Sequence, residues 1–384
     1  MTQHRRTFLK IGSMAATLTA LPARASHAFA QAAMQGKRIV RQAAPENLES
    51  DFGALTEFLT PTDQHYVRSH FAVPAVDPAT WTLQVKGAVG QPLTLTLDQL
   101  RALPKISKVV TLECAGNGRQ YLTPQVPGVQ WERGAVSTAE WTGVRVADLL
   151  AKAGVATDAT RLVFEGVDKG EVKNSPFPSG AIPFHRSISI AEAKAREVFV
   201  AWAINGQPLP AAHGAPVRLI VPGCYGMASV KWLSTIDAIK GESGSYWETT
   251  DYAYWDRSTG HPLRRPLMGM QVKSHIARPA ANGQVTRGTT VDIVGAAWSD
   301  GTVTRVEVST DGGASWRDAE FMDPESAVTW RRWRLRWQVP ATGTEAVLMS
   351  RATDVKGRTQ PMTRSADYGT YVIHHVIPVP VKLL

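Results

Sequence analysis

Cysteine is the scarcest residue of this 384-residue sequence, which contains only Cys114 and Cys224. The sequence has no Cys-x-x-Cys-His motif, so no haem is predicted in this chain, and no Cys/His cluster with structural zinc spacing. Gly-x-Gly-x-x-Gly, P-loop and Gly-x-Ser-x-Gly motifs are also absent. These absences argue against a dinucleotide-binding protein, a P-loop nucleotidase and a nucleophile-elbow hydrolase.

Extended runs of one charge are missing as well. The sequence has 42 basic and 33 acidic residues, a formal net charge of +9, without a long Lys/Arg cluster. Four of the basic residues and none of the acidic ones lie in the first 30 positions, and without that segment the net charge is +5. This mild basicity predicts no nucleic-acid binding, and it suits anionic small substrates and an acidic protein partner equally well.

The first 30 residues have the features of an export signal. Arg5 and Arg6 precede a modestly apolar stretch, Ile11–Leu21, and Ala28–Ala30 offers a small-x-small cleavage site. The sequence therefore predicts a twin-arginine signal peptide over 1–30, a periplasmic location, and export after folding with a cofactor already bound. A membrane anchor is the alternative, but the apolar stretch is shorter than the ~20 residues that a span needs.

The remaining length exceeds what one hydrophobic core usually organises, so two domains are expected, over 31–265 and 266–384. Residues 31 to about 61 lack periodicity and are predicted to form an irregular arm. After the arm, a mixed α+β domain with a majority of strands is expected. Its clearest elements are strands at 81–87, 198–204 and 217–221, and helices at 97–103 and 146–153.

The second domain shows only strand and turn signals and is predicted to be a small β-sandwich. Val303–Ser309 alternates in polarity and is followed by a turn at Asp311–Gly313. Within 332–337, two tryptophans and a leucine share one face of a strand, and three arginines share the other. We interpret the arginine face as a solvated strand; a docking surface for an acidic redox partner is the alternative.

The run Thr111–Arg119 contains Cys114 followed by small, turn-forming residues and then a cation. A thiolate suits a soft metal, and arginine suits an oxyanion, so the run is a candidate metal and anion site. Two cysteines in an exported protein are also consistent with one disulfide, and spacing alone does not decide between these hypotheses.

Four other runs carry candidate functional side chains: Tyr66–His70, His213–Arg218, Ser229–Trp232 and Thr250–Tyr252. Taken singly, each has a structural explanation, because isolated histidines, lysines and tyrosines more often pack or face solvent than bind a ligand. Their residue types alone do not establish a function.

In this order and spacing, the runs resemble the sulfite oxidase family of molybdenum enzymes, and in particular its haem-free periplasmic sulfite dehydrogenases from bacteria. The resemblance extends from about Tyr66 to about Tyr371. It implies an α+β molybdopterin-binding catalytic domain followed by an immunoglobulin-like β-sandwich dimerisation domain. The runs that carry it are Cys114–Asn117, His213–Arg218, Val230–Trp232 and Val308–Trp316.

The resemblance also implies roles for individual residues. Cys114 is expected to be the protein ligand of a molybdenum ion that a pyranopterin dithiolene also holds. Arg68 and Arg119 are expected to bind the substrate oxyanion, Trp131 to line the pocket, and Tyr252 to bind substrate or a metal-bound oxygen. The expected pterin-binding residues are Tyr66, Val67, Arg68, Ser69, His70, Asp168, His213, Arg218, Ser229, Val230 and Lys231.

The implied reaction is the two-electron oxidation of sulfite to sulfate in a homodimer, with an external c-type cytochrome accepting the electrons. Gly118 and Tyr368 stand where vertebrate relatives carry arginines, which predicts a weaker anion site. A sulfane dehydrogenase subunit, which oxidises carrier-bound sulfur, is the main alternative. A methionine sulfoxide reductase and a cofactor-free binding protein stapled by a Cys114–Cys224 disulfide are further alternatives.

Overall fold

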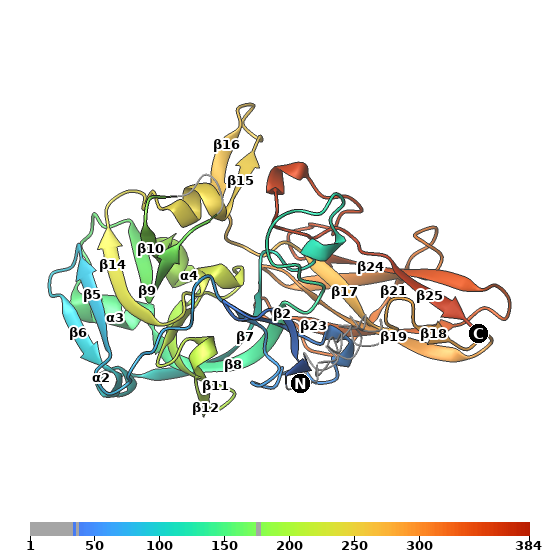
Figure 1. The fold of residues 1–384 in the computed structure, drawn as a ribbon, viewed down its shortest axis with the longest axis horizontal. Coiled ribbons are helices and arrows are strands. Elements are labelled where there is room, and N and C mark those ends of the chain that lie inside the picture. The colour runs from blue at the N-terminus through green and yellow to red at the C-terminus, as the bar shows by residue number, and fades with distance from the viewer. Residues whose placement is uncertain (1–33, 36–37, 174–177) are drawn as a thin grey trace, which may run out of the picture.

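The computed structural model describes residues 34–35, 38–173 and 178–384 (Figure 1). The predicted signal peptide at 1–30 lies outside the described residues. No helix within the described ranges is long and apolar enough to cross a membrane. The chain forms an N-terminal part of strands and short helices and, along the long axis of the molecule, a mainly β part that contains the C-terminus (Figure 1).

The prediction of an irregular arm over residues 31 to about 61 is wrong, because much of this segment forms a four-stranded sheet with the strand Val67–Arg68. Its strands, in the spatial order β1-β2-β3-β4, are β1 (Met34–Gln35), β2 (Arg38–Gln42), β3 (Asn47–Ser50) and β4 (Val67–Arg68). All four residues of β3 are buried although three of them are polar. Glu49, for example, accepts from the backbone N–H groups of Gly134 at 2.6 Å and Glu132 at 3.1 Å. Because these buried polar groups are hydrogen-bonded, the strand can be buried without showing hydrophobic periodicity in its sequence.

Two five-stranded sheets organise the N-terminal part. The first sheet, in the order β10-β9-β14-β5-β6, contains β5 (Thr82–Gly87), β6 (Leu93–Thr96), β9 (Arg161–Glu171), β10 (Ala181–Ser189) and β14 (Leu233–Ile239). The second contains β7 (Lys105–Glu113), β8 (Val136–Arg145), β11 (Phe199–Ile204), β12 (Gln207–Pro208) and β13 (Arg218–Ile220). The helices are α2 (Leu97–Arg101), α3 (Val146–Ala153) and α4 (Ile190–Ala195), and a hairpin of β15 (Ala253–Asp256) and β16 (Leu263–Pro266) projects from this part (Figure 1).

Local sequence signals predicted several of these elements well. Helix α3 has the expected bounds and ends at Gly154, which adopts the left-handed conformation that glycine tolerates (φ 64°). Strand β11 runs into a tight turn at Asn205 and Gly206, both with positive φ, as the Asn-Gly signal predicts. Helix α2 is shorter than predicted but begins with a capping box between Thr96 and Gln99.

The C-terminal part is a two-sheet β-sandwich, which confirms the predicted fold class. One sheet has the order β17-β19-β23-β22 and the other β18-β25-β24-β20-β21. The strands are β17 (Lys273–Arg278), β18 (Gln284–Val285), β19 (Thr290–Trp298), β20 (Val303–Ser309), β21 (Arg317–Asp318), β22 (Glu320–Phe321), β23 (Arg331–Gln338), β24 (Glu345–Asp354) and β25 (Val379–Leu383). Apolar side chains from both sheets, including Trp333, Leu335 and Trp337, form its core.

The arginine face of β23 is paired with acidic residues of its own sheet. Arg332 lies 2.8 Å from Asp323, and Arg334 lies 3.1 Å from Glu320. Arg336 is more exposed and lies 3.9 Å from a carboxylate of β19. These pairs match the interpretation of a solvated strand, because local carboxylates offset most of its positive charge.

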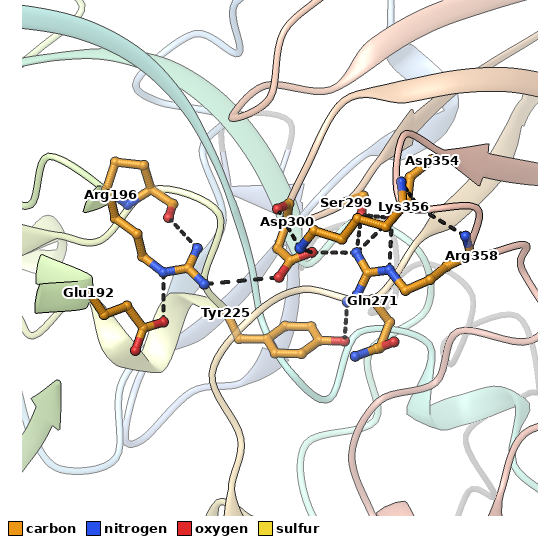
Figure 2. A network of polar contacts seen from close by, with 10 residues as sticks. Glu192, Arg196, Tyr225, Gln271, Ser299, Asp300, Asp354, Lys356 and Arg358 are labelled. Atoms are coloured by element: carbon orange, nitrogen blue, oxygen red, sulfur yellow. Dashed lines mark hydrogen bonds and ion pairs between the residues drawn. The ribbon is translucent and has the colours of Figure 1, made fainter. Parts of the chain in front are cut away.

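The two parts also share a core and a polar network. The largest hydrophobic cluster includes side chains of the N-terminal part together with Trp298, Trp330 and Val372 from the sandwich part. At the edge of this junction, Arg196, just after α4, lies 3.9 Å from Asp300, which also pairs with Lys356 and Arg358 (Figure 2). The sandwich is therefore packed directly against the domain that carries the candidate site.

Candidate active site

Cys114 lies in a tight turn at the end of β7. The backbone N–H of Cys114 donates to Ala135 O at 2.9 Å, and its carbonyl accepts from Asn117 N at 2.8 Å. A Cβ at Gly116 would lie 2.3 Å from the Arg119 guanidinium, and Gly118 has φ 95°, so both positions need glycine. The small residues of the motif thus let the arginine side chain fold back close to the turn.

One face of this turn meets an inner pocket of about 50 Å³. Its walls come from β4, the turns before β13 and β14, and the segment after the π-helix at Trp247–Asp251. The lining residues are His65, Tyr66, Val67, Arg68, Ser69, His70, Leu112, Cys114, Ala115, Asp168, Phe184, Ala212, His213, Arg218, Gly226, Met227, Ser229, Lys231, Trp232 and Tyr252.

Three cations line the inner pocket without a carboxylate within ion-pair distance among the described residues: Arg68, Arg218 and Lys231. Arg218 donates to the carbonyls of His213 at 3.2 Å and Ser229 at 3.0 Å. Lys231 Nζ donates to the Ser69 hydroxyl at 2.9 Å. Burial lowers the pKa of Arg218 to about 10 and the pKa of Lys231 well below its usual value. Buried cations without carboxylates are costly unless an anion neutralises them.

Several buried polar atoms of the pocket also lack a hydrogen-bond partner: His65 Nε2, His213 Nε2 and Asp168 Oδ1. Burial lowers the pKa of His65 to about 3 and that of His213 well below normal, so both imidazoles are neutral near pH 7. Burial raises the pKa of Asp168 to about 6, opposed by the charge of Lys231. Unpaired buried donors and acceptors around one pocket indicate a polar ligand.

A larger outer cleft of about 1360 Å³ meets the inner pocket at Cys114. Four residues line both spaces: Arg68, His70, Cys114 and Tyr252. Arg119 lines only the outer cleft, together with Asp251, Tyr368 and Tyr371 among others. The thiol is thus placed at the boundary between a buried cationic pocket and an open cleft.

Arg119 is held rigidly in the outer cleft. Its Nη1 donates to Val129 O at 2.7 Å, and its Nε donates to Thr370 O at 3.0 Å. The guanidinium lies 5.2 Å from the centre of the Tyr371 ring, whose hydroxyl donates to Asp251 at 2.9 Å. No carboxylate within the described part of the chain forms an ion pair with Arg119, so its charge is available to an anion in the cleft.

Tyr252 follows the π-helix and is fixed by two neighbours. Its hydroxyl lies 2.6 Å from His70 Nε2, and its ring lies 5.8 Å from the guanidinium carbon of the buried Arg186. Arg186 donates to Trp247 O and Leu267 O, which secures the start of the π-helix and the segment after β16. Burial raises the pKa of Tyr252 and, together with Arg68, lowers that of His70, so the phenol keeps its proton and the imidazole is neutral.

Comparisons with known proteins decide the family. Residues 70–247 match an oxidoreductase molybdopterin binding domain, and residues 264–369 match a Mo-co oxidoreductase dimerisation domain. The chain is 39% identical over 339 residues to mitochondrial sulfite oxidase of Mus musculus, covering 83% of this chain and 60% of that protein. It is 36% identical over 341 residues to sulfite oxidase of Gallus gallus, covering 84% of this chain and 72% of that protein. This chain belongs to the sulfite oxidase family.

A solved structure agrees with this assignment to the sulfite oxidase family. The crystal structure of the sulfane dehydrogenase SoxCD from Paracoccus pantotrophus matches with a TM-score of 0.78 and 26% identity. The match covers 96% of this chain and 92% of that chain. This chain spans about 60% of the length of the mouse sulfite oxidase.

The residues of the inner pocket fit the molybdopterin cofactor of the sulfite oxidase family. The terminal phosphate of a pterin cofactor needs cations, and Arg68, Arg218 and Lys231 supply them without competing carboxylates in the described ion pairs. A pterin ring needs donors and acceptors, and Asp168 and His213 each carry an unpaired polar atom. No group of three or more His, Cys, Asp or Glu side chains in the described ranges is arranged to hold a metal alone. Cys114 therefore suits a metal whose other ligands come from the cofactor.

Most residues expected from the resemblance to the sulfite oxidase family lie where such a cofactor and substrate would bind. Two do not contact either space. Trp131 is fully buried behind Cys114 in the cluster that also contains Trp141, and it lines neither the inner pocket nor the outer cleft. Val230 points into the main core, and its carbonyl accepts from Leu219 N at 2.7 Å. Val230 alternates with Ser229 and Lys231, which line the inner pocket, and Trp131 follows Gln130, which lines the outer cleft, so both are packing residues next to the site.

Sequence reasoning missed other residues of this sulfite oxidase-type site. His65 and Phe184 line the inner pocket, and Tyr371 lines the outer cleft. His65 directly precedes the run Tyr66–His70 that the sequence analysis had identified, which is a signal that could have found it. Phe184 and Tyr371 come from distant strands and the C-terminal tail, and no local pattern marks them.

The alternative of a Cys114–Cys224 disulfide is wrong in this structure, where both thiols are free and buried. Cys114 belongs to the cluster around Trp131, and Cys224 belongs to the main core. Burial raises the pKa of the Cys224 thiol to about 12, so it stays protonated and inert. Cys224 is a small buried apolar residue, as predicted.

Proposed function

We propose that this protein catalyses the molybdenum-dependent oxidation of sulfite to sulfate. The observation that carries the proposal is the placement of Cys114 between the cationic inner pocket and an outer cleft that contains Arg119. When bound in the inner pocket, the molybdenum–molybdopterin supplies the two-electron redox chemistry and the oxygen transferred to substrate. The protein residues bind, orient and electrostatically stabilise the reacting anion.

The arginines perform the electrostatic part of this reaction. Sulfite approaches the cofactor as an anion, and the fixed guanidinium groups of Arg68 and Arg119 offset its charge. Because Arg119 is 4% exposed and already held by two carbonyls, it needs little reorganisation when the substrate binds. Preorganised charges of this kind stabilise charge that develops in a transition state.

Tyr252 supplies a hydrogen bond rather than a base. An oxyanion in the cleft requires a donor, and the protonated Tyr252 hydroxyl provides one when its oxygen accepts from His70 Nε2–H. In that tautomer, His70 sets the direction of the hydroxyl hydrogen. Its stacking on Phe184, with ring centres 4.4 Å apart, fixes the imidazole for this role.

The direct test is molybdenum content and sulfite turnover in natively exported protein and in a Cys114→Ser variant. We expect about one molybdenum per chain and sulfite-dependent electron release in the native protein. The variant should lose activity by about a thousandfold or more, because the metal loses its only protein ligand. Molybdenum-free native protein from a host that makes the cofactor would contradict the proposal.

A second candidate function, oxidation of sulfur bound to a carrier protein, is favoured by one observation. The similarity to the sulfane dehydrogenase SoxCD covers 96% of this chain, with a TM-score of 0.78. Comparing kcat/KM on free sulfite with that on a persulfide-carrying protein separates the two functions. Preference for the carrier by tenfold or more would replace the first proposal with the second.

The partners and location belong to the same proposal. Electrons leave to an external c-type cytochrome, since the sequence has no haem-attachment motif. The match of 264–369 to a dimerisation domain supports a homodimer. Twin-arginine export to the periplasm is supported by Arg5 and Arg6. Mass measurement of the purified native protein and fractionation of cells that express the full chain test the last two points.

A further inference from the structure

The residue before Cys114 is held by the β-sandwich. Glu113, at the end of β7, is 1% exposed and accepts from Lys273 Nζ at 2.8 Å and Trp298 Nε1 at 2.8 Å. Lys273 begins β17 and Trp298 ends β19, so both partners belong to the other part of the molecule. No sequence motif connects these residues with the site.

Lys273 also reaches the turn itself. Its Nζ donates to Asn117 O at 2.9 Å, and the Asn117 amide donates to Glu113 Oε1 at 3.1 Å. The Asn117 side-chain oxygen accepts from Ala135 N at 3.1 Å, on the strand-end segment that also pairs with Cys114. Both Glu113 oxygens are thereby satisfied, which is the condition under which a buried ion pair is retained.

The C-terminal tail holds the same turn from a second direction. Val372 N donates to Ala115 O at 2.8 Å, and Thr370 O accepts from Arg119 Nε at 3.0 Å. A Cβ at Gly118 would lie 3.0 Å from Ile373, so tail and turn are in close contact. The turn therefore has little freedom to move without the sandwich part.

We propose that Lys273 is a positioning residue for the Cys114 thiolate, acting through Glu113 and Asn117. It keeps the turn in one conformation and neutralises a carboxylate that would otherwise lie, buried and unpaired, beside a thiolate. The β-sandwich is then a structural component of the metal site as well as a module for association. This inference does not depend on which sulfur compound the enzyme oxidises.

The chain offers a matched control in the network of Figure 2. Arg196 also pairs across the junction, with Asp300 at 3.9 Å, and donates to Pro222 O at 3.2 Å. None of its contacts reaches Glu113, Asn117 or Cys114. Arg196→Met therefore weakens the junction without touching the Cys114 turn.

The experiment uses full-length protein, purified after native export, as wild type, Lys273→Met, Lys273→Arg and Arg196→Met. The fraction of Cys114 that iodoacetamide labels in a fixed time is measured by mass spectrometry and expressed relative to wild type, together with molybdenum per chain. We expect Lys273→Met to increase relative Cys114 labelling about tenfold and to lower molybdenum content, with Lys273→Arg partly restoring both. Arg196→Met should leave both values at the wild-type level.

Two results would overturn the inference. One is unchanged labelling and molybdenum content in folded Lys273→Met protein, and the other is an equal change in Arg196→Met, which would indicate general loosening of the junction. If Lys273→Met does not fold, Trp298→Phe removes one hydrogen bond to Glu113 while keeping the aromatic packing. It should increase Cys114 labelling by about threefold, and no increase would contradict the proposal.

Discussion

The inner pocket and the outer cleft meet at Cys114 but differ in how they are built. The inner pocket is lined by buried or half-buried cations and neutral histidines, and the one carboxylate among its described lining residues, that of Asp168, keeps an unpaired oxygen. The outer cleft has more cations, Arg119 among them, together with Glu171, Asp251 and tyrosines of the C-terminal tail. The first is a fixed site for one polyanionic cofactor, whereas the second is an open surface where cations and carboxylates lie together, so that single changes of charge can retune substrate affinity.

Removing a cation from the inner pocket should have the largest effect. Lys231→Met should lower molybdenum per chain to about a tenth or less of the wild-type value, because the cofactor phosphate loses a buried counter-charge. Metal analysis after gel filtration measures this. Lys169→Met, at an exposed position of the outer cleft, is the control and should keep its molybdenum. Equal loss of molybdenum in both variants would show that the inner pocket and the outer cleft do not differ in their contribution to cofactor binding.

Removing Arg119 from the outer cleft should weaken substrate binding and leave the cofactor content unchanged. Arg119→Gln should raise KM for sulfite by about a hundredfold, since a hydrogen-bonded charge facing the anion is worth roughly 2–3 kcal/mol. Steady-state kinetics at constant ionic strength measure the change, and molybdenum content should remain at the wild-type level. A loss of molybdenum in this variant would indicate instead that Arg119 helps to hold the cofactor.

Changing the net charge of the outer cleft should give smaller shifts. Tyr368→Arg and Asp251→Asn should each lower KM for sulfite by about threefold to tenfold, because both make the cleft more positive. Asp251→Asn keeps the size of the side chain that Tyr371 contacts. Tyr368→Phe is the neutral control. Unchanged affinity in both charged variants would show that the weaker charge of this cleft does not limit sulfite binding.

The smallest effect concerns the carboxylate of the inner pocket. Burial raises the folded-state pKa of Asp168 to about 6, above its unfolded value, so the folded state binds the proton more tightly. The free energy of unfolding of cofactor-free protein should therefore fall as pH rises from about 4 to about 6. Asp168→Asn should abolish this slope and be more stable than wild type above pH 6. Thermal unfolding across pH 4–8 tests it, and identical slopes would contradict the assigned environment.

Local signals and motifs predicted a large share of the fold and of the inner pocket. Helix α3 ends at the predicted glycine, and the buried and exposed faces of β23 alternate as expected. Eleven of the residues expected to bind or ligate the cofactor line the pocket, because motif residues stay next to one another along the chain. The arm at 31–61 was mispredicted because its strand β3 buries polar groups in specific hydrogen bonds.

The sequence by itself determined the family and the two-part fold and predicted Cys114 as the metal-binding thiolate, since these depend on short runs of residue types at fixed spacing. Only the tertiary structure decided that Cys224 is an inert core residue and that Trp131 and Val230 pack behind the site. It also decided that Lys273 and Tyr371, distant in sequence from Cys114, belong to the surroundings of the metal site. Long-range packing and buried ion pairs join residues that share no local pattern, so they become visible only in the folded chain.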